Sequence, residues 1–411
     1  MMKINSQCRD CDSKKLVKFL DLDRQPPANS FLNAEQLRQT EPVYPLQVYF
    51  CSDCHLVQLI HVVDKDELFR HYVYFSSEMP KVSSYWQSYA ENVIGRFLKN
   101  RNDLVVEVGS NDGVLLEFFK NSGFRVLGID PAENIAKVAE ARGVPTLTEF
   151  FDLGVVEKAV KDYGQARAIL ANNVVAHIDD HQDLCAGVHA FLHREGVWVI
   201  EAPYLIDMFE NLTYDTVYHE HLSFLAVRPL QKLFEKYGLE IFDVQVVPAQ
   251  GQSIRLFIGH QDVRPVGRSV TELVQKELDF RLDRTESYFE LAQRVKNSKD
   301  RLLRILTDLK KQGKKIAAYG APAKGNTLLN YCKIGSGVLD YVLDELPSKQ
   351  GLYTPGRHLP VVTKEFAATH PPDYYLLLAW NYQQAVLDKE QPFIQRGGKF
   401  IIPVGDDPKI L

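Results

Sequence analysis

Side chains that could move a proton are concentrated in one short run, Tyr214-Asp215-Thr216-Val217-Tyr218-His219-Glu220-His221-Leu222-Ser223. Histidine titrates near neutral pH, a neighbouring carboxylate can fix its tautomer, and a phenol can donate a hydrogen bond to an oxyanion. This set suits the removal of a weakly acidic proton from carbon. Two alternatives stay open: a metal-ligand pair, although the run lacks helical i, i+4 spacing, and a polar loop that only satisfies backbone groups.

A glycine turn that carries acids is the second chemical signal. The apolar strand expected over 104–108 contains Glu107 and runs into Gly109-Ser110-Asn111-Asp112-Gly113. A second apolar strand, over 126–129, ends in Asp130. This pair is typical of the first two strands of a nucleotide-binding α/β sheet, in which glycines let the backbone approach the ligand and the second acid binds a ribose diol.

The acids near the first turn decide which nucleotide derivative fits. Glu107 and Asp112 would repel the pyrophosphate of a dinucleotide, whereas they would attract the ammonium and sulfonium groups of S-adenosylmethionine. We therefore expect an S-adenosylmethionine site at this turn.

Four of the six cysteines form two C-x2-C pairs, Cys8 with Cys11 and Cys51 with Cys54. Two such pairs can complete a closed tetrahedral zinc site. Disulfides are the alternative, which a reducing cytoplasm disfavours. Because four sulfur ligands leave no position for water, we expect a structural and not a catalytic Zn²⁺.

Near the C-terminus a strand again enters a turn of small residues, Tyr319-Gly320-Ala321-Pro322-Ala323-Lys324. A helix start offers free backbone N–H groups and a positive dipole end, which suit a phosphate, and Lys324 adds a charge. The alternative is a helix start with a solvated lysine. The turn-rich stretch 351–360 could close over the same pocket.

The elements that must position these groups alternate between strand and helix. We expect further strands over 168–171 and 196–200, so that His177 follows a strand end at the ligand edge of a doubly wound sheet. A helix is expected over 83–100, and one or two connecting helices over 270–311. After these, strands recur over 315–319, 342–343, 375–378 and 400–402.

Composition limits the function classes. A chain of 411 residues, 45% hydrophobic and 25% charged, should form two or three globular domains. The formal charge of −5 gives no basic footprint for nucleic acid or for an anionic membrane. No leader or spanning segment is apparent, so we expect a cytoplasmic protein. Oligomeric state is not readable from the sequence, and a monomer is compatible with it.

Together these motifs resemble those of the zinc-containing sugar C-methyltransferases, which act on nucleotide-linked 4-keto-deoxysugars. The likeness covers essentially the whole chain, through the cysteine pairs and the runs 107–113, 218–221 and 319–327. It implies an α/β architecture of three domains: a zinc-binding module over 1–75, a Rossmann-like class I methyltransferase domain over 76–300, and a second Rossmann-like domain for the nucleotide sugar over 301–411.

The resemblance also implies roles. In the family a histidine removes the proton from sugar C3, beside the C4 ketone, and the enolate attacks the methyl group of S-adenosylmethionine. His221 matches the base, Glu220 and Tyr218 match its pocket partners, and His177 and Tyr72 match two polar residues near the sugar. Matching cofactor positions are Glu107, Gly109, Ser110, Asn111, Gly113, Asp130, Glu149, Phe150 and Asn172. Nucleotide candidates, with thymidine diphosphate expected, are Tyr319, Lys324 and Asp344.

The chain departs from the family pattern at two positions. Asn111 stands where many S-adenosylmethionine enzymes have glycine, so the backbone could approach the cofactor differently there. Gln252 stands where a second glycine is expected, which bears on the sugar pocket.

Two other classes of function compete with this interpretation. A zinc-module methyltransferase for RNA or protein would keep the cofactor site, but an RNA enzyme should show a basic groove or a run of stacking aromatics. A nucleotide-binding scaffold without chemistry would have no reason to hold Tyr218, Glu220 and His221 together.

Overall fold

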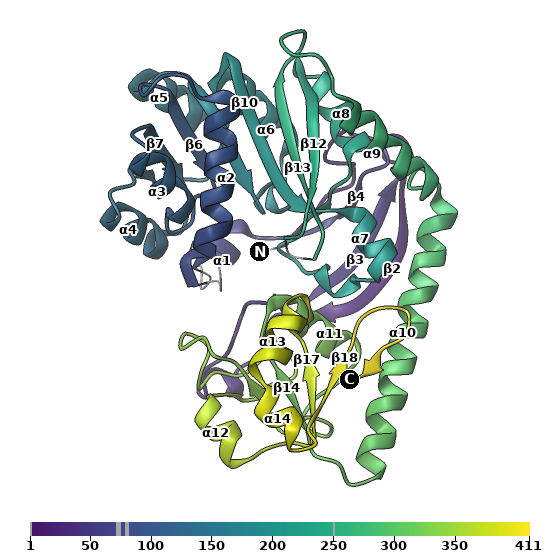
Figure 1. Ribbon diagram of the computed structural model, residues 1–411. Coiled ribbons are helices and arrows are strands. Elements are labelled where there is room, and N and C mark those ends of the chain that lie inside the picture. The colour runs from purple at the N-terminus through teal and green to yellow at the C-terminus, as the bar shows by residue number, and fades with distance from the viewer. Residues whose placement is uncertain (1, 71–74, 79–81, 250) are drawn as a thin grey trace.

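A computed structural model describes residues 2–70, 75–78, 82–249 and 251–411. Figure 1 shows the central domain in the upper half, the C-terminal domain in the lower half, and the strands of the N-terminal module between them. The long helix α10 (Thr285–Lys311) runs along one side and joins the two larger domains. Our expected boundary between residues 300 and 301 falls inside this continuous helix.

The central domain is built on a seven-stranded sheet with the order β12-β13-β10-β9-β6-β7-β8. Five neighbouring strands are parallel, β13 runs antiparallel to β10, and β12 runs antiparallel to β13. The strands are β6 (Leu104–Val108), β7 (Arg125–Ile129), β8 (Thr146–Leu147), β9 (Ala166–Asn172), β10 (Leu192–Pro203), β12 (Leu239–Val247) and β13 (Ser253–His260). The Rossmann-like sheet is therefore confirmed, and the antiparallel pair at its edge was not predicted.

Helices cover this sheet and connect it to the other domains. They are α2 (Val82–Phe97), α3 (Val114–Asn121), α4 (Glu133–Ala141), α5 (Leu153–Tyr163), α6 (His181–Phe191), α7 (Leu205–Asn211), α8 (Val227–Glu235) and α9 (Arg268–Asp279). Short 3₁₀ turns, η2 (Ser76–Glu78), η3 (Val175–His177) and η4 (Tyr214–Thr216), precede or follow these elements near the sheet's ligand edge. In the described part of the chain, no helix has the length and apolar character needed to cross a membrane.

The N-terminal module contains a small antiparallel sheet with the order β11-β4-β3-β2. Its own elements are β1 (Met2–Ile4), β2 (Leu16–Gln25), η1 (Gln36–Arg38), β3 (Tyr44–Cys51), β4 (Val57–Leu59), β5 (His61–Val63) and α1 (Lys65–Phe69). The fourth strand, β11 (Ser223–Phe224), comes from the central domain. The module is thus joined to the segment that carries His221.

The C-terminal domain has a six-stranded sheet with the order β16-β15-β14-β17-β18-β19, parallel except for β19. Its strands are β14 (Ile316–Tyr319), β15 (Val342–Leu343), β16 (Val361–Val362), β17 (Tyr374–Leu377), β18 (Lys399–Ile402) and β19 (Lys409–Ile410). Its helices are α11 (Ala323–Tyr331), α12 (Lys364–Thr369), η5 (Trp380–Tyr382), α13 (Gln383–Lys389) and α14 (Gln391–Gln395). This second parallel sheet agrees with the alternation in the sequence.

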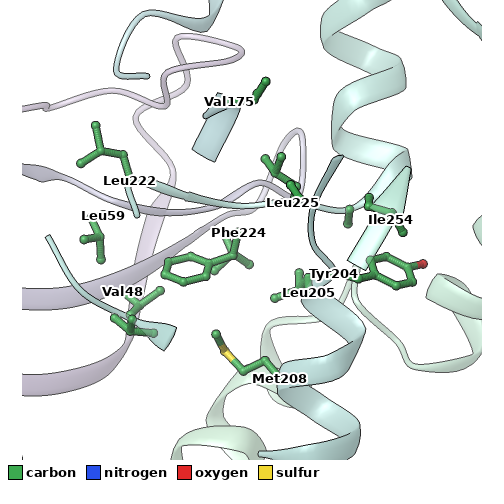
Figure 2. Close-up of a cluster of buried hydrophobic side chains, with 14 of the residues drawn as sticks. Val48, Leu59, Val175, Tyr204, Leu205, Met208, Leu222, Phe224, Leu225 and Ile254 are labelled. Atoms are coloured by element: carbon green, nitrogen blue, oxygen red, sulfur yellow. The ribbon is translucent and has the colours of Figure 1, made fainter. Parts of the chain in front are cut away.

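One continuous hydrophobic core runs from the N-terminal strands into the central domain. Figure 2 shows Val48 and Leu59 of the module facing Leu222, Phe224 and Met208 of the central domain. These side chains are buried, and burial of each large one contributes roughly 1.5–3 kcal/mol. The core therefore fixes the backbone immediately after His221.

Candidate active site

The glycine turn after β6 has the backbone conformation that its sequence predicts. Gly109 and Gly113 have φ angles of 66° and 74°, which favour glycine. A Cβ atom on Gly109 would lie 2.8 Å from Cγ2 of Val174. Asn111 has a φ of 48° and so keeps a glycine-like conformation, which asparagine tolerates better than most residues. The substitution at this position therefore leaves the turn intact.

Asp130 at the end of β7 ties the turn to the sheet. Its Oδ2 accepts a hydrogen bond from the Asn111 backbone N–H at 2.8 Å, and its Oδ1 accepts one from Ala132 at 2.9 Å. Asn111 Oδ1 in turn accepts from the backbone N–H of Ser76 at 2.8 Å, so η2 covers the turn. Each carboxylate oxygen keeps a second lone pair for a further donor.

Glu107 lies under the turn with one oxygen unpaired. Its Oε1 accepts from Nδ2 of Asn172 at 3.2 Å. Among the described residues its Oε2, Oγ of Ser110 and Oδ1 of Asn172 have no partner. Burial raises the pKa of Glu107 well above its usual range. A cationic ligand would supply donors and restore the charged form, so this group fits the ammonium of S-adenosylmethionine.

Glu149 and Phe150 follow β8, which is parallel to β7, and therefore lie at the same sheet edge as Asp130. Glu149 is exposed and Phe150 is half-buried. Lys65 Nζ lies 4.1 Å and the Arg70 guanidinium 4.9 Å from the centre of the Phe150 ring. The ring is thus held by α1 and its end.

Backbone hydrogen bonds anchor the segment that carries His221. The N–H of Leu222 donates to the carbonyl of Ala176 at 2.7 Å, and the N–H of Leu59 donates to the carbonyl of Leu222 at 2.9 Å. The next residues enter β11, where Ser223 pairs with Gln58. In Figure 2 the Leu222 side chain lies in the buried cluster, so the residue after His221 is held in the core.

His221 and Tyr218 form a hydrogen-bonded pair. His221 Nδ1 lies 2.7 Å from the Thr216 carbonyl, and its Nε2 lies 2.7 Å from the Tyr218 hydroxyl. A carbonyl only accepts, so Nδ1 carries the hydrogen and Nε2 presents its lone pair to the Tyr218 O–H. Burial lowers the pKa of His221 to about 4. The ring is therefore a neutral base at physiological pH.

His177 lies beside His221. The two ring centres are 5.1 Å apart, and His177 also stacks on Phe69 at 5.6 Å. Burial and the neighbouring His221 lower the pKa of His177 well below its usual range. Tyr72 falls outside the described residues.

Glu220 is buried next to this pair and contacts a residue that the sequence did not single out. Asn29 Nδ2 donates to Oε1 of Glu220 at 2.8 Å and to its Oε2 at 3.0 Å. Asn29 belongs to the N-terminal module, 191 positions away in sequence. His219 points elsewhere, with Nε2 3.3 Å from the Tyr44 carbonyl.

The four paired cysteines meet in one cluster. The Sγ atoms of Cys8, Cys11, Cys51 and Cys54 all lie within 4.8 Å of one another. Three of the cysteines are buried and Cys11 is half-buried. Four thiolates without another ligand type fit Zn²⁺, because zinc takes tetrahedral sulfur sites of this spacing.

Comparison with known proteins covers all three parts of the chain. Residues 8–69 match a family model described as "Putative zinc binding domain", residues 83–244 match "Methyltransferase domain", and residues 248–405 match "C-methyltransferase C-terminal domain". The chain is 35% identical over 409 residues to C-methyltransferase NovU of Streptomyces niveus, with 98% of this chain and 96% of that protein covered. The chain belongs to the C-methyltransferase family.

Solved methyltransferases resemble part of the chain. The magnesium protoporphyrin IX methyltransferase of Synechocystis PCC 6803 is 12% identical, with 44% of this chain and 83% of that chain covered and a TM-score of 0.34. The 1,6-didemethyltoxoflavin N1-methyltransferase of Burkholderia thailandensis is 18% identical, with 44% and 78% covered and a TM-score of 0.33. The family match makes this chain an S-adenosylmethionine-dependent C-methyltransferase with a zinc-binding module.

In this C-methyltransferase the three nucleotide candidates of the C-terminal domain already have internal partners. Asp344 accepts from the Ala321 N–H at 2.6 Å and so shapes the turn before α11. Tyr319 donates its hydroxyl to Glu390 at 3.1 Å. The stretch 351–360 contacts the N-terminal module, because Tyr353 forms an antiparallel bridge with Leu32.

Lys324 is buried between the central and C-terminal domains of the C-methyltransferase. Its Nζ donates to Oδ1 of Asn381 at 2.6 Å and lies 3.8 Å from the ring centre of Trp380. Trp380 Nε1 donates to Oδ2 of Asp215 at 2.7 Å. Burial lowers the pKa of Lys324 to about 8, although Asp215 and Asp207 oppose this shift. The lysine is therefore not a solvated side chain. A bound phosphate would interact with the same ammonium group as the carboxylates of Asp215 and Asp207.

The loop between Cys8 and Cys11, called here the zinc loop, contacts His181 and through it the turn η3 that carries His177. Asp10 Oδ1 lies 2.7 Å from His181 Nδ1, and His181 Nε2 lies 3.1 Å from the carbonyl of Val175. Arg9 contacts the carbonyls of Leu59 and Ile178. No sequence signal marked the contacts of Arg9 with Ile178 and of Asp10 with His181, because each joins residues about 170 positions apart.

Proposed function

We propose that this C-methyltransferase removes the C3 proton of a nucleotide-linked 4-keto-deoxysugar and methylates the resulting enolate, in the biosynthesis of a branched deoxysugar in the cytoplasm. The observation that carries the proposal is the pair His221 and Tyr218, a neutral imidazole with a fixed tautomer beside a phenol. The family resemblance supports the sugar, and the acidic balance of the chain gives no support to an RNA substrate.

The geometry suggests separate roles for His221 and Tyr218 in the reaction. In the free protein the Tyr218 hydroxyl occupies the lone pair of His221 Nε2. A substrate ketone near Tyr218 could accept this hydrogen bond instead, which would free Nε2 to take the proton from the neighbouring carbon. Tyr218 would then stabilise the enolate oxygen while His221 holds the proton. Bound S-adenosylmethionine supplies the methyl group as an electrophile.

We propose further that the nucleotide half binds the C-terminal domain at the turn before α11. Support comes from the general affinity of helix N-termini for phosphate and from the charge of Lys324. Asp344 would act by holding the turn, since it accepts from the Ala321 N–H, and Tyr319 would act from the strand before it, where Glu390 is its partner. A thermal-shift screen with nucleoside diphosphates, thymidine diphosphate first, tests this part, and the absence of a shift with any of them contradicts it.

Solvent exchange tests the chemistry. The protein is incubated in heavy water with a thymidine diphosphate-linked 4-keto-6-deoxysugar, with and without S-adenosylmethionine, and the sugar is analysed by mass spectrometry and NMR. We expect deuterium at the carbon beside the ketone without the cofactor and a new C-methyl group with it. A methyltransferase for RNA or protein, or a scaffold without chemistry, leaves the sugar unlabelled and unmethylated.

A further inference from the structure

The N-terminal module contributes a polar side chain to the proposed active site. Asn29 Nδ2 lies 2.8 Å and 3.0 Å from the two oxygens of the buried Glu220 carboxylate. A hydrogen bond to an ionised acceptor is stronger than one between neutral groups, and a donor shared by both oxygens fixes the plane of the carboxylate. Asn29 therefore constrains the orientation of Glu220.

Asn29 is itself held by the C-terminal domain. Asn326 of α11 is buried and donates from Nδ2 to the carbonyl of Ala28 at 2.8 Å. A little further along, Leu32 and Tyr353 exchange two backbone hydrogen bonds of 3.0 Å and 2.8 Å. Glu41 accepts from the backbone N–H of Gly356. The segment from residue 28 to residue 41 is thus held against the C-terminal domain. At its start, Asn29 contacts Glu220 of the central domain.

The position of Asn326 connects this segment to the turn for which we propose nucleotide binding. Asn326 lies on the first turn of α11, two residues after Lys324. The chain of contacts therefore runs from that helix start through the Ala28 carbonyl to Asn29 and on to Glu220. Each step is a direct hydrogen bond or a covalent neighbour, so a change at the helix start can alter the geometry at Glu220.

We infer that Asn29 is a positioning residue for Glu220 and that Asn326 links its placement to the C-terminal domain. The inference deepens the proposed function and rests on it for the role of Glu220. Under it, the site is complete only when all three domains are in contact. The base and its carboxylate neighbour come from the central domain, a donor to that carboxylate comes from the module, and Asn326 of the C-terminal domain holds the backbone beside that donor.

Substitution at Asn29 tests the inference. Asn29→Asp keeps the shape but removes the donor, and Asn29→Ala removes the side chain. We expect either change to lower kcat for methyl transfer by about 10- to 100-fold, the range for a lost hydrogen bond to a charged group. The Kd for S-adenosylmethionine should stay within about twofold. Ser30→Ala, at the exposed neighbour, is the matched control and should keep wild-type kcat.

A double-mutant cycle tests the link to Asn326. Asn326→Ala should lower kcat, and the double variant with Asn29→Ala should be no slower than Asn29→Ala alone, because Asn326 acts on Glu220 only through the hydrogen bond of Asn29. If the losses in kcat of the two single variants multiply in the double variant, Asn326 does not act through Asn29. Circular dichroism and the melting temperature show whether each variant folds.

The failure of this inference is distinguishable from the failure of the proposed function. If the wild-type protein neither exchanges nor methylates any ketosugar, the proposed function fails, and the inference is then judged by crystal structures of the wild-type protein and of Asn29→Ala. The plane of the Glu220 carboxylate should rotate in Asn29→Ala, because the donor that its two oxygens share is gone. An unchanged orientation of Glu220, or unchanged kcat in both Asn29 variants of an active enzyme, overturns the inference.

Discussion

At the scale of single residues, His221 has the clearest expected role. Its Nδ1 is fixed by the Thr216 carbonyl, so the orientation of Nε2 depends on a backbone contact and not on substrate. We predict that His221→Asn lowers methyl transfer by roughly 10²-fold or more, the range for a positioned base. The Kd for S-adenosylmethionine, measured by calorimetry, should change little. Turnover at the wild-type rate would exclude His221 as the base.

Tyr218 gives a prediction that separates two roles. If its hydroxyl stabilises the enolate oxygen, Tyr218→Phe should lower both solvent exchange and methyl transfer by roughly 10²-fold. If the hydroxyl only occupies the lone pair of His221, its removal should leave the rates unchanged or raise them. Parallel measurement of exchange and transfer decides between these results, and only the first agrees with the proposed mechanism.

The lowered pKa of His221 predicts the pH at which activity is lost on the acidic side of the pH profile. Protonation removes the base, so activity is lost as the pH falls through the folded pKa, which is about 4. At pH 5 about 90% of the enzyme should then keep a neutral His221, whereas an ordinary histidine would leave only about 3% neutral. The pH profile of kcat/KM for solvent exchange measures this. A midpoint near 6.5 would contradict the buried environment of the ring.

At the scale of elements, the sequence predicted those strands and turns whose formation depends on neighbouring residues. The apolar runs that become β6, β7, β9 and β10 and the glycine turn after β6 are recognisable because burial on both faces and a positive φ each require particular residues. The antiparallel strands β12 and β13 and the two-residue β11 were not predicted. The antiparallel pairing of β13 with β10 is set by a strand that is not its neighbour in sequence, although β12 pairs with β13 across a short loop. The short strand β11 lies opposite Gln58 and Val57 of the distant N-terminal module.

The glycine turn also allows a stability and affinity test with an internal control. Gly109→Ala would place a Cβ 2.8 Å from Val174 at a φ of 66°, a conformation that costs an L-residue about 1–2 kcal/mol before any clash. We predict weaker S-adenosylmethionine binding and lower stability in urea. Gly95→Ala, in the interior of α2 with no atom within 4 Å of the added Cβ, should instead stabilise by about 0.5–1 kcal/mol. Equal effects of the two changes would contradict this account.

At the scale of the whole molecule, the candidate site depends on contacts that sequence could not reveal. The cluster around His221 was recognisable because its residues are adjacent in the chain. Asn29, Arg9 and Asp10 were not, because each acts on a residue far away in sequence. The same limit applies to Lys324, whose partners Trp380 and Asp215 come from different domains.

Removal of the metal should therefore loosen the active site, because the zinc loop contacts the segment that carries His177. Cys8 and Cys11 enclose Arg9 and Asp10, which hold the carbonyl of Ile178 and the ring of His181. We predict that chelation loosens the N-terminal module and speeds amide exchange over residues 175–181 and at Leu222, because structural zinc contributes directly to folding free energy.

Hydrogen-exchange mass spectrometry before and after chelation measures this effect. The peptides of β14 and β17 in the C-terminal sheet serve as the control, because their hydrogen bonds do not involve the module. Restoring Zn²⁺ should restore the slow exchange, since four sulfur ligands give the ion a structural role and leave no open position for chemistry. A metal-free protein that keeps slow exchange at Leu222 and full activity would show that the cysteine cluster does not position the histidines.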